Sequence, residues 1–211
     1  MTGILYQKGT NFTLNLFNIS KMNLKDLVLK TRSYRRFEES RRIDTKTLES
    51  LIDLARVSAS GANRQPLKYV LYNTPEECAR IFPYLAWAGY LTEWLGAEKG
   101  ERPSGYIMIL GDKTITEVFG IDHGIAAQTI LLGASEAGLG GCMIASIKRE
   151  EFRNDYELPD KYEILLIIAL GKPIENVIID EIEGDDVKYW RDGNRFHHVP
   201  KRKLKDIIIK L

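Results

Sequence analysis

The stretch GIAAQTILLGA, residues 124–134, decides the fold, because nearly every residue in it is apolar. Gln128 and Thr129 are its only strongly polar residues, so a helix over this stretch has no broad polar face to turn toward water. We therefore predict a helix that is buried nearly all round, either at the centre of the protein or between two subunits. The glycine-rich run Gly138 to Gly141 is expected to form the turn that ends it.

A second apolar run, Ile164 to Leu170, is bounded by Gly171 and is too short for an ordinary helix. It predicts a strand that is covered on both faces. Tyr69 to Tyr72 and Tyr106 to Leu110 are β-prone and predict two more strands. The chain is therefore expected to mix α and β structure.

Capping residues mark the starts of three helices. Asn23 precedes the first helix, and Asp44 precedes a second in which apolar residues recur every third or fourth position. Thr74 and Glu77 form a capping box around a proline, which suits the first turn of a helix. A further helix is expected around Lys148 to Tyr156. The apolar face of the second helix comprises Leu48, Leu51, Ile52 and Ala55.

Length and charge narrow the class of protein. The 211 residues suit one domain. The 30 Lys and Arg residues against 29 Asp and Glu residues leave a formal net charge of +1, so no overall field favours nucleic acid or an anionic membrane. No apolar run reaches the roughly 20 residues that span a bilayer. We expect neither a nucleic-acid partner nor a membrane partner, and any anion site must be local.

The cysteines and the N-terminal residues indicate the cellular compartment of the protein. Cys78 and Cys142 are too few for a disulfide framework and fit a reducing cytoplasm. Residues 1–22 lack the pattern of a secretory signal and are expected to form a loosely ordered N-terminal arm. Residues 23–211 are expected to form a single domain of a cytoplasmic protein.

The usual self-contained catalytic motifs are absent from the sequence. The histidines, His123, His197 and His198, have no cysteine or carboxylate partner at metal-ligand spacing. The sequence has neither a G-x-S-x-G elbow nor a Walker A motif, and Met143 stands where the last glycine of a dinucleotide fingerprint would fall. These absences argue against common hydrolase and nucleoside-triphosphatase chemistry. They favour a resident cofactor that carries the reaction.

Three polar clusters suit such a cofactor, although each has an ordinary alternative. Arg32 to Arg36 reads RSYRR and offers guanidinium groups to a phosphate or an electron-rich ring, or else is a solvated helix end. Asn63 to Pro66 reads NRQP and offers two amides to the edge of a pyrimidine-like ring, or else is a plain loop. Lys201 to Lys203 reads KRK and is either a third binding cluster or an exposed face.

Taken in order from Lys25 to the end of the chain, these pieces resemble the nitroreductase family of FMN-dependent oxidoreductases. The resemblance implies an α+β fold of the nitroreductase type, with a mixed, mainly antiparallel sheet flanked by helices. It also implies an interlocked homodimer with flavin sites at the interface and an extended C-terminal arm that reaches the partner. The matching motifs are Arg32-Ser33-x-Arg35, Asn63-x-Gln65-Pro66, Gly124-Ile125-Ala126-Ala127-Gln128, Gly138-Leu139-Gly140 with Cys142 to Ser146, Gly171-Lys172-Pro173 and Val199-Pro200-Lys201-Arg202.

The same resemblance assigns residues to the flavin. Thr31 stands where many family members carry another arginine, which shifts more of the phosphate contact to the C-terminal motif. No catalytic side chain and no metal are expected, because the flavin N5 carries the chemistry. By resemblance, Arg32, Ser33, Lys201 and Arg202 would hold the ribityl phosphate, Arg35 would lie by N1 and O2, Asn63 and Gln65 would bind pyrimidine or ribityl atoms, and the backbone at Ala145 and Ser146 would face N5 and O4.

The implied activity is ping-pong reduction, in which NADH or NADPH reduces bound FMN and leaves before a nitroaromatic, quinone or similar small acceptor takes the electrons. We hypothesise that Trp87, Tyr90 and Trp94 cover the substrate, with plain core packing as the alternative. A flavin-binding or flavin-buffering protein without turnover would share every cofactor motif, and a flavin-free interaction module is a weaker rival. The missing dinucleotide fingerprint favours FMN over FAD.

Overall fold

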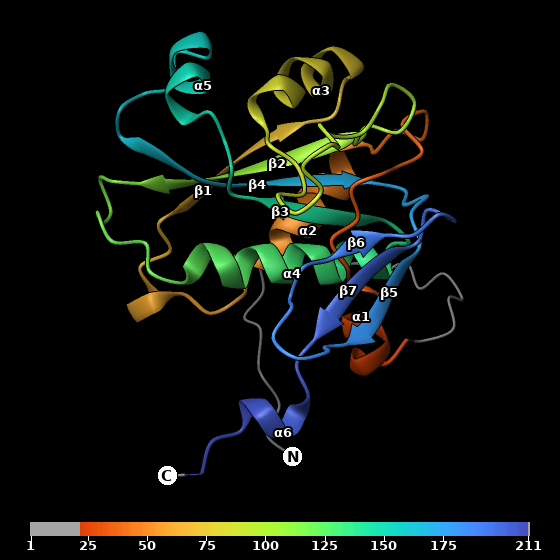
Figure 1. Cartoon of the computed structure of the whole chain (residues 1–211). Coiled ribbons are helices and arrows are strands. Elements are labelled where there is room, and N and C mark those ends of the chain that lie inside the picture. Colours follow the sequence, from red (N-terminus) through yellow and green to blue (C-terminus); the bar gives the residue numbers. More distant parts are fainter. Residues whose placement is uncertain (1–21, 211) are drawn as a thin grey trace.

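The structure, a computed structural model, describes residues 22–210, so the predicted N-terminal arm lies outside the described residues except for Met22. A four-stranded antiparallel sheet, in the order β1-β2-β4-β3, forms its centre (Figure 1). All three strands expected from the sequence form, and each is longer than predicted. The strands are β1 (Leu67–Tyr72), β2 (Gly105–Asp112), β3 (Gly140–Ile144) and β4 (Tyr162–Gly171).

Helices cover both faces of this sheet and give the protein three layers (Figure 1). One face is covered by α2 (Thr45–Arg56) and α4 (Asp122–Glu136). The other is covered by α3 (Pro75–Ile81), continued by the short η2 (Phe82–Tyr84), and by α5 (Arg149–Asp155). The first helix, α1 (Leu24–Lys30), packs beside α4 and buries none of its own residues.

The two central strands, β2 and β4, supply side chains to both layers. In β2, Ile107 and Ile109 pack into the cluster under α2 and α4, whereas Tyr106 and Met108 pack into the cluster under α3 and α5. All four side chains are fully buried. Burial of one large aliphatic side chain contributes about 1.5–3 kcal/mol, so these strands anchor the fold. The same alternation in β4 confirms the predicted strand that is covered on both faces.

The predicted helix caps are confirmed. The Asn23 and Asp44 side chains each accept a hydrogen bond from the backbone N–H three residues later, at 3.0 and 2.7 Å. Thr74 and Glu77 make the reciprocal capping box, with proline in the first turn. In α2, Leu48, Leu51 and Ala55 are buried as expected, while Ile52 is half-buried. Local sequence therefore fixes where α1, α2 and α3 begin.

The central helix is less buried within one chain than its sequence predicts. Ala126, Ala127 and Ile130 of α4 pack against the sheet, but Gly124 and Gln128 are exposed. No element of residues 22–210 covers this strip of the helix. The expectation of burial at the centre of a single chain is therefore wrong, whereas the alternative, burial between two subunits, stays a prediction.

The turn after α4 is also shorter than predicted. Gly138 makes the turn with a φ of 73°, whereas Gly140 and Gly141 already belong to β3. Gly141 instead lies against the segment that follows α1: Ser33 bridges to it, and its carbonyl accepts a hydrogen bond from the Tyr34 N–H at 3.0 Å. The missing side chain at Gly141 leaves room on the other side for the Ala169 carbonyl of β4 and for the Leu131 side chain of α4.

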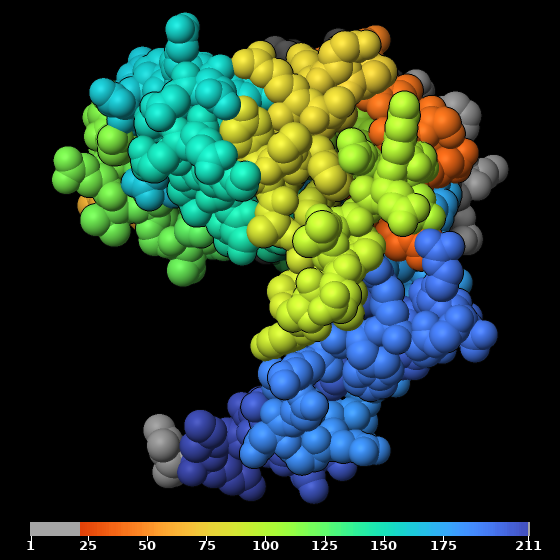
Figure 2. Space-filling view, turned by 45° about the horizontal axis from the view of Figure 1, so that its top comes forward, coloured from red at the N-terminus to blue at the C-terminus, as the bar shows by residue number. Residues whose placement is uncertain are grey.

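The C-terminal part of the chain, from β5 onward, lies outside the three layers and forms a second sheet. β5 and β7 pair in parallel, and β6 pairs antiparallel to β7. α6 stands away from the body in Figure 1, and the same region projects in Figure 2, with residues 201–210 exposed. Across residues 22–210, no helix is long and apolar enough to cross a membrane. The elements are β5 (Val177–Glu181), β6 (Trp190–Arg191), β7 (His197–Lys201) and α6 (Leu204–Ile207).

We expect Gly141→Ala to lower the free energy of unfolding by about 1–3 kcal/mol, because overpacking of a tight site is destabilising. A Cβ at this position would collide with the carbonyl oxygen of Ala169 and lie 2.8 Å from the Leu131 side chain. Urea unfolding followed by circular dichroism measures the change. Gly193→Ala is the matched control, since no atom lies within 4 Å of its added Cβ. Equal midpoints for the two variants would contradict the expected close approach.

Candidate functional site

One cavity collects four of the residues predicted to form the site. Arg35, Trp87, Ala145 and Ser146 all line it, and its volume is about 170 Å³. The remaining wall comes from the neighbours of these residues in residues 86–89 and 142–146, together with Tyr189. The cavity therefore lies where the segment after α1, the end of β3 and the C-terminal part of the chain meet.

Hydrogen bonds hold the segment after α1 along the edge of β3. The buried Thr31 hydroxyl donates to the Leu27 carbonyl at 2.7 Å and is 2.8 Å from the Ser135 hydroxyl near the end of α4. The Ser33 bridge to Gly141 then aligns the next residues with β3. Thr31, which departs from the family pattern, thus ties this segment to the central helix.

The guanidinium of Arg35 is held by neutral groups. Its Nη1 donates to the Ser33 carbonyl at 3.2 Å and lies 3.2 Å from Nε2 of His197. The same guanidinium lies over the Tyr189 ring, 4.9 Å from the centroid, which is a cation–π contact. None of these three partners carries a negative charge, so the positive charge remains available to a ligand in the cavity.

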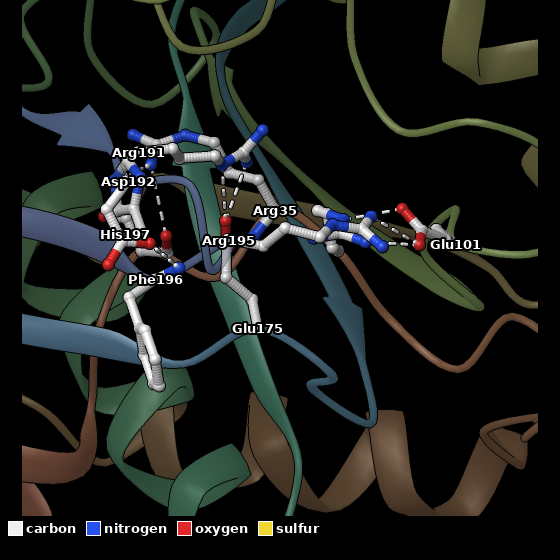
Figure 3. A network of polar contacts seen from close by, with 10 residues as sticks. Arg35, Glu101, Glu175, Arg191, Asp192, Arg195, Phe196 and His197 are labelled. Carbon is white, nitrogen blue, oxygen red and sulfur yellow. Dashed lines mark hydrogen bonds and ion pairs between the residues drawn. The ribbon is translucent and has the colours of Figure 1, made fainter.

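The nearby carboxylate, Glu175, has other partners (Figure 3). One oxygen of this buried side chain accepts from the Arg35 backbone N–H at 2.9 Å. The other accepts from Nε and Nη2 of Arg191 at 3.1 and 2.7 Å. Glu175 therefore fixes the Arg35 backbone and pairs with a different guanidinium.

His197 is fully buried beside Arg35. Burial lowers the pKa of this imidazole to about 4, an effect that Arg35 and Arg191 reinforce and that Glu175 opposes. Because an arginine can only donate, Nε2 must accept, which leaves the proton on Nδ1. Nδ1 has no hydrogen-bond partner among the described residues. Neutral His197 is thus an uncharged acceptor for Arg35.

Sequence reasoning missed Glu175 and His197. Arg35 meets them across 140 and 162 positions of sequence. Nothing in the residues around either position marks them, since Glu175 merely follows the end of a strand and His197 stands beside a second histidine. Only the fold reveals their contact with Arg35.

Several donors near the cavity lack a protein partner. Nη2 of Arg32 donates to the Val28 carbonyl at 2.7 Å, but the buried Nε has no partner among the described residues. Ser33 is exposed, and the Ser146 N–H donates no hydrogen bond within residues 22–210. A bound anion or polar ring edge would satisfy these donors.

Cys142 also lines the cavity, and burial raises the pKa of its thiol to about 11 despite the nearby Arg35. A thiol with such a pKa is protonated at neutral pH and a poor nucleophile. Over the described part of the chain, no group of three or more His, Cys, Asp or Glu side chains is placed to hold a metal ion.

Asn63 and Gln65 lie in a different place. The loop that carries them holds three non-glycine residues at positive φ: Ala62 at 50°, Asn63 at 54° and Gln65 at 52°. Gln65 and the buried Asp122 line a separate cavity of about 270 Å³. Such left-handed backbone costs of order 1–3 kcal/mol per residue and needs support from its surroundings.

Asp122, at the start of α4, gives that support. Its carboxylate accepts from the Ser60 hydroxyl at 2.6 Å and from the Gly61 N–H at 2.9 Å. The Ser60 oxygen in turn accepts from the Gln65 N–H at 2.9 Å. This is a second supporting acid that the sequence did not indicate.

The loop and the segment that leads from α1 to Arg35 are attached to opposite ends of the same helix. The loop binds Asp122 at the first turn of α4, whereas Thr31 binds Ser135 at the last turn. The 1.5 Å rise per residue of an α-helix puts these two positions roughly 20 Å apart. Neither Asn63 nor Gln65 lines the cavity that Arg35 lines.

Lys201 ends β7, the strand that His197 begins, and Arg202 follows it. Arg202 donates to the exposed Asp185 at 3.1 Å, and Lys201 is exposed. No hydrogen bond or ion pair joins either of them to Arg32 or Ser33 in residues 22–210.

The three rings expected to cover the substrate differ in position. Trp87 is buried, stacks on Phe82 at 5.4 Å and lines the cavity. Tyr90 instead packs against Tyr189, with ring centroids 4.9 Å apart, and Trp94 lies under the Arg191 guanidinium at 4.1 Å. Figure 2 shows this yellow-green segment against the blue C-terminal part.

Two comparisons with known proteins both find nitroreductases. The model of the Nitroreductase family matches residues 28–172. A candidate NAD(P)H nitroreductase, YodC, of Bacillus subtilis (strain 168) is 23% identical over 179 residues, which are 70% of this chain and 89% of YodC.

Solved structures show the same fold. The nitroreductase family protein of Streptococcus pneumoniae TIGR4 has a TM-score of 0.64 at 15% identity, over 90% of this chain and 100% of that one. A candidate nitroreductase of Exiguobacterium sibiricum 255-15, solved in complex with FMN, has a TM-score of 0.61 at 15% identity, over 74% and 90% of the two chains.

We expect His197 to make stability depend on pH between its ordinary pKa near 6.5 and its folded value of about 4. The unfolded chain binds more protons in this window, so the stabilisation is complete above about pH 6.5 and is lost as the pH falls toward 4. The slope contributed is at most about 1.4 kcal/mol per pH unit.

Urea unfolding at several pH values tests this expectation. His197→Gln should flatten the profile in that window, whereas His198→Gln, the adjacent histidine, should keep the slope that His197 contributes. Parallel profiles for the wild type and His197→Gln would contradict a buried neutral His197.

Proposed function

The chain belongs to the nitroreductase family, and on this premise we propose that it is an FMN-dependent oxidoreductase that uses NADH or NADPH. Bound FMN would take a hydride from the nicotinamide, which then leaves, and would pass two electrons to a small aromatic or quinone-like acceptor in a ping-pong cycle. The observation that carries the proposal is the Arg35 guanidinium on the cavity wall, whose contacts within residues 22–210 are with neutral groups.

The chemistry of the cavity fits a flavin. A guanidinium suits the N1 and O2 side of the ring, where reduction places negative charge. The free N–H of Ser146 suits the opposite polar edge. Arg32, with its unpartnered Nε, and the exposed Ser33 are suited to the phosphate. Lys201 and Arg202 complete the proposed phosphate site.

The acceptor would enter beside Trp87. Its buried ring and Tyr189 border the cavity and offer flat apolar surface to an aromatic molecule. Tyr90 and Trp94 do not line the cavity themselves. They would act indirectly, because their contacts with Tyr189 and Arg191 hold the segment that carries Trp87. No acid or base side chain of the chain is required for this reaction, and the work of the protein is to bind, orient and exclude water.

We further propose that two copies of the chain share each site. Neither Asn63 nor Gln65 lines the Arg35 cavity, and their loop is held at the opposite end of α4, roughly 20 Å from the end that holds Thr31. These positions favour a second copy as the source of the two amides. The exposed strip of α4 at Gly124 and Gln128 offers a surface for that copy. The exposed residues 201–210 are the proposed arm that reaches the partner.

The wild-type chain is expected to sediment as a dimer, with about twice the mass of one 24.1 kDa chain. Gly124→Arg places a large charged side chain on the exposed strip of α4 and should shift the protein toward single chains. Analytical ultracentrifugation measures both masses. Glu150→Arg, exposed on α5 beyond the other face of the sheet, is the control. A wild type that sediments as one chain would contradict the shared site.

Arg35→Met should weaken FMN binding about 10-fold to 100-fold, because a hydrogen bond to a charged group is worth about 1.5–3 kcal/mol. Fluorescence titration of FMN measures the change. Lys148→Met, an exposed lysine that pairs with Glu151 on the surface, is the control and should bind FMN normally.

An anaerobic absorbance spectrum of the wild type with FMN, before and after NADH and then NADPH, tests the activity itself. We expect a bound flavin band that bleaches with at least one donor. A bound flavin that resists both donors would favour the flavin-binding alternative. A protein that retains no flavin would refute the proposal.

A further inference from the structure

We propose that His197 is a positioning residue for Arg35: it fixes the guanidinium beside the flavin without neutralising its charge. The inference deepens the proposed function and rests on it. Its basis is the contact between Nη1 of Arg35 and Nε2 of His197 at 3.2 Å, made by a fully buried imidazole on the wall side of the guanidinium.

His197 is itself held firmly. It begins β7, where it pairs with Val177 of β5, and its backbone N–H donates to the Asn176 carbonyl at 2.8 Å. The Tyr189 ring packs against the imidazole with centroids 5.2 Å apart. An acceptor on a paired strand and under an aromatic ring has little freedom, so it can fix the direction of a long arginine side chain.

The neutrality of the acceptor matters for the proposed chemistry. A carboxylate at this position would bind the guanidinium more strongly but would cancel much of its field. Glu175 is the carboxylate at hand, and its oxygens already serve the Arg35 backbone and the Arg191 side chain. Burial and the two arginines keep His197 uncharged through the neutral pH range. The side chain of Arg35 is therefore anchored and still fully charged toward the cavity.

Loss of the His197 acceptor should therefore change how strongly the protein binds reduced FMN relative to oxidised FMN. Without Nε2, the guanidinium keeps the Ser33 carbonyl and the Tyr189 ring, and it is free to turn toward Glu175. Its charge would spend less time beside the pyrimidine ring. The protein would therefore hold reduced FMN less tightly relative to oxidised FMN.

The test uses the full chain loaded with FMN and measures the midpoint potential of the bound flavin together with FMN affinity and thermal stability. His197→Met removes the acceptor at similar volume and should lower the preference for reduced FMN about 10-fold, which is about 30 mV for a two-electron couple. His197→Gln places an oxygen near the position of Nε2 and should restore the wild-type potential. His198→Gln is the matched control, because His198 pairs with Asp180 and not with Arg35.

A double-mutant cycle separates positioning from simple destabilisation. In an Arg35→Met background, His197→Met should cause no further change in potential, since its effect acts through Arg35. If His197→Met does not fold, His197→Asn replaces it, because the shorter side chain withdraws its acceptor from Arg35.

The outcomes are distinct. A potential that is the same in the wild type and His197→Met, or that shifts equally with and without Arg35, would overturn the role of His197 alone. A wild type that binds no FMN would overturn the proposed function and this inference with it.

Discussion

The need to cover both faces of β2 and β4 governs the architecture. Their alternating side chains are buried in two separate clusters, so each face requires its own layer of helices. On one face lies α4, whose residues 124–134 are nearly all apolar, and it packs against the sheet while a further strip of it remains exposed. The same packing brings its last turn to Thr31 and its first turn to the loop at Gly61. The central helix thus sets the position of both groups of candidate binding residues.

The charge of the site depends on which arginine each nearby carboxylate pairs with. Glu175 satisfies the Arg35 backbone and pairs with Arg191, while Glu101 pairs with Arg36 and Arg195 (Figure 3). Each of these carboxylates is engaged elsewhere, so the Arg35 side chain is left to a carbonyl, an imidazole and an aromatic ring. Arg35 is half-buried on the cavity wall, and within residues 22–210 its guanidinium contacts only neutral groups, so its charge is placed to bind a ligand in the cavity.

The separation of the Asn63 loop from the Arg35 cavity connects the fold to the proposed assembly. Within one chain, Gln65 of this loop borders one cavity and Arg35 another. The exposed strip of α4 and the projecting C-terminal part are the surfaces that the proposed second copy would use. The left-handed backbone of the loop, supported by Asp122, keeps its amides ready for such a contact.

The sequence by itself determined the starts of α1, α2 and α3, the central strands and the binding motifs, because caps, apolar periodicity and short motifs act between neighbours in the chain. It left open whether α4 is covered by its own chain or by another, since an apolar pattern does not tell which chain covers a face. Asp122, Glu175 and His197 could not be predicted, because their roles arise from contacts across 61, 140 and 162 positions of sequence. Only the tertiary structure brings such residues together: hydrogen bonds depend on distance and direction in space, and neither is encoded in the local pattern around these residues.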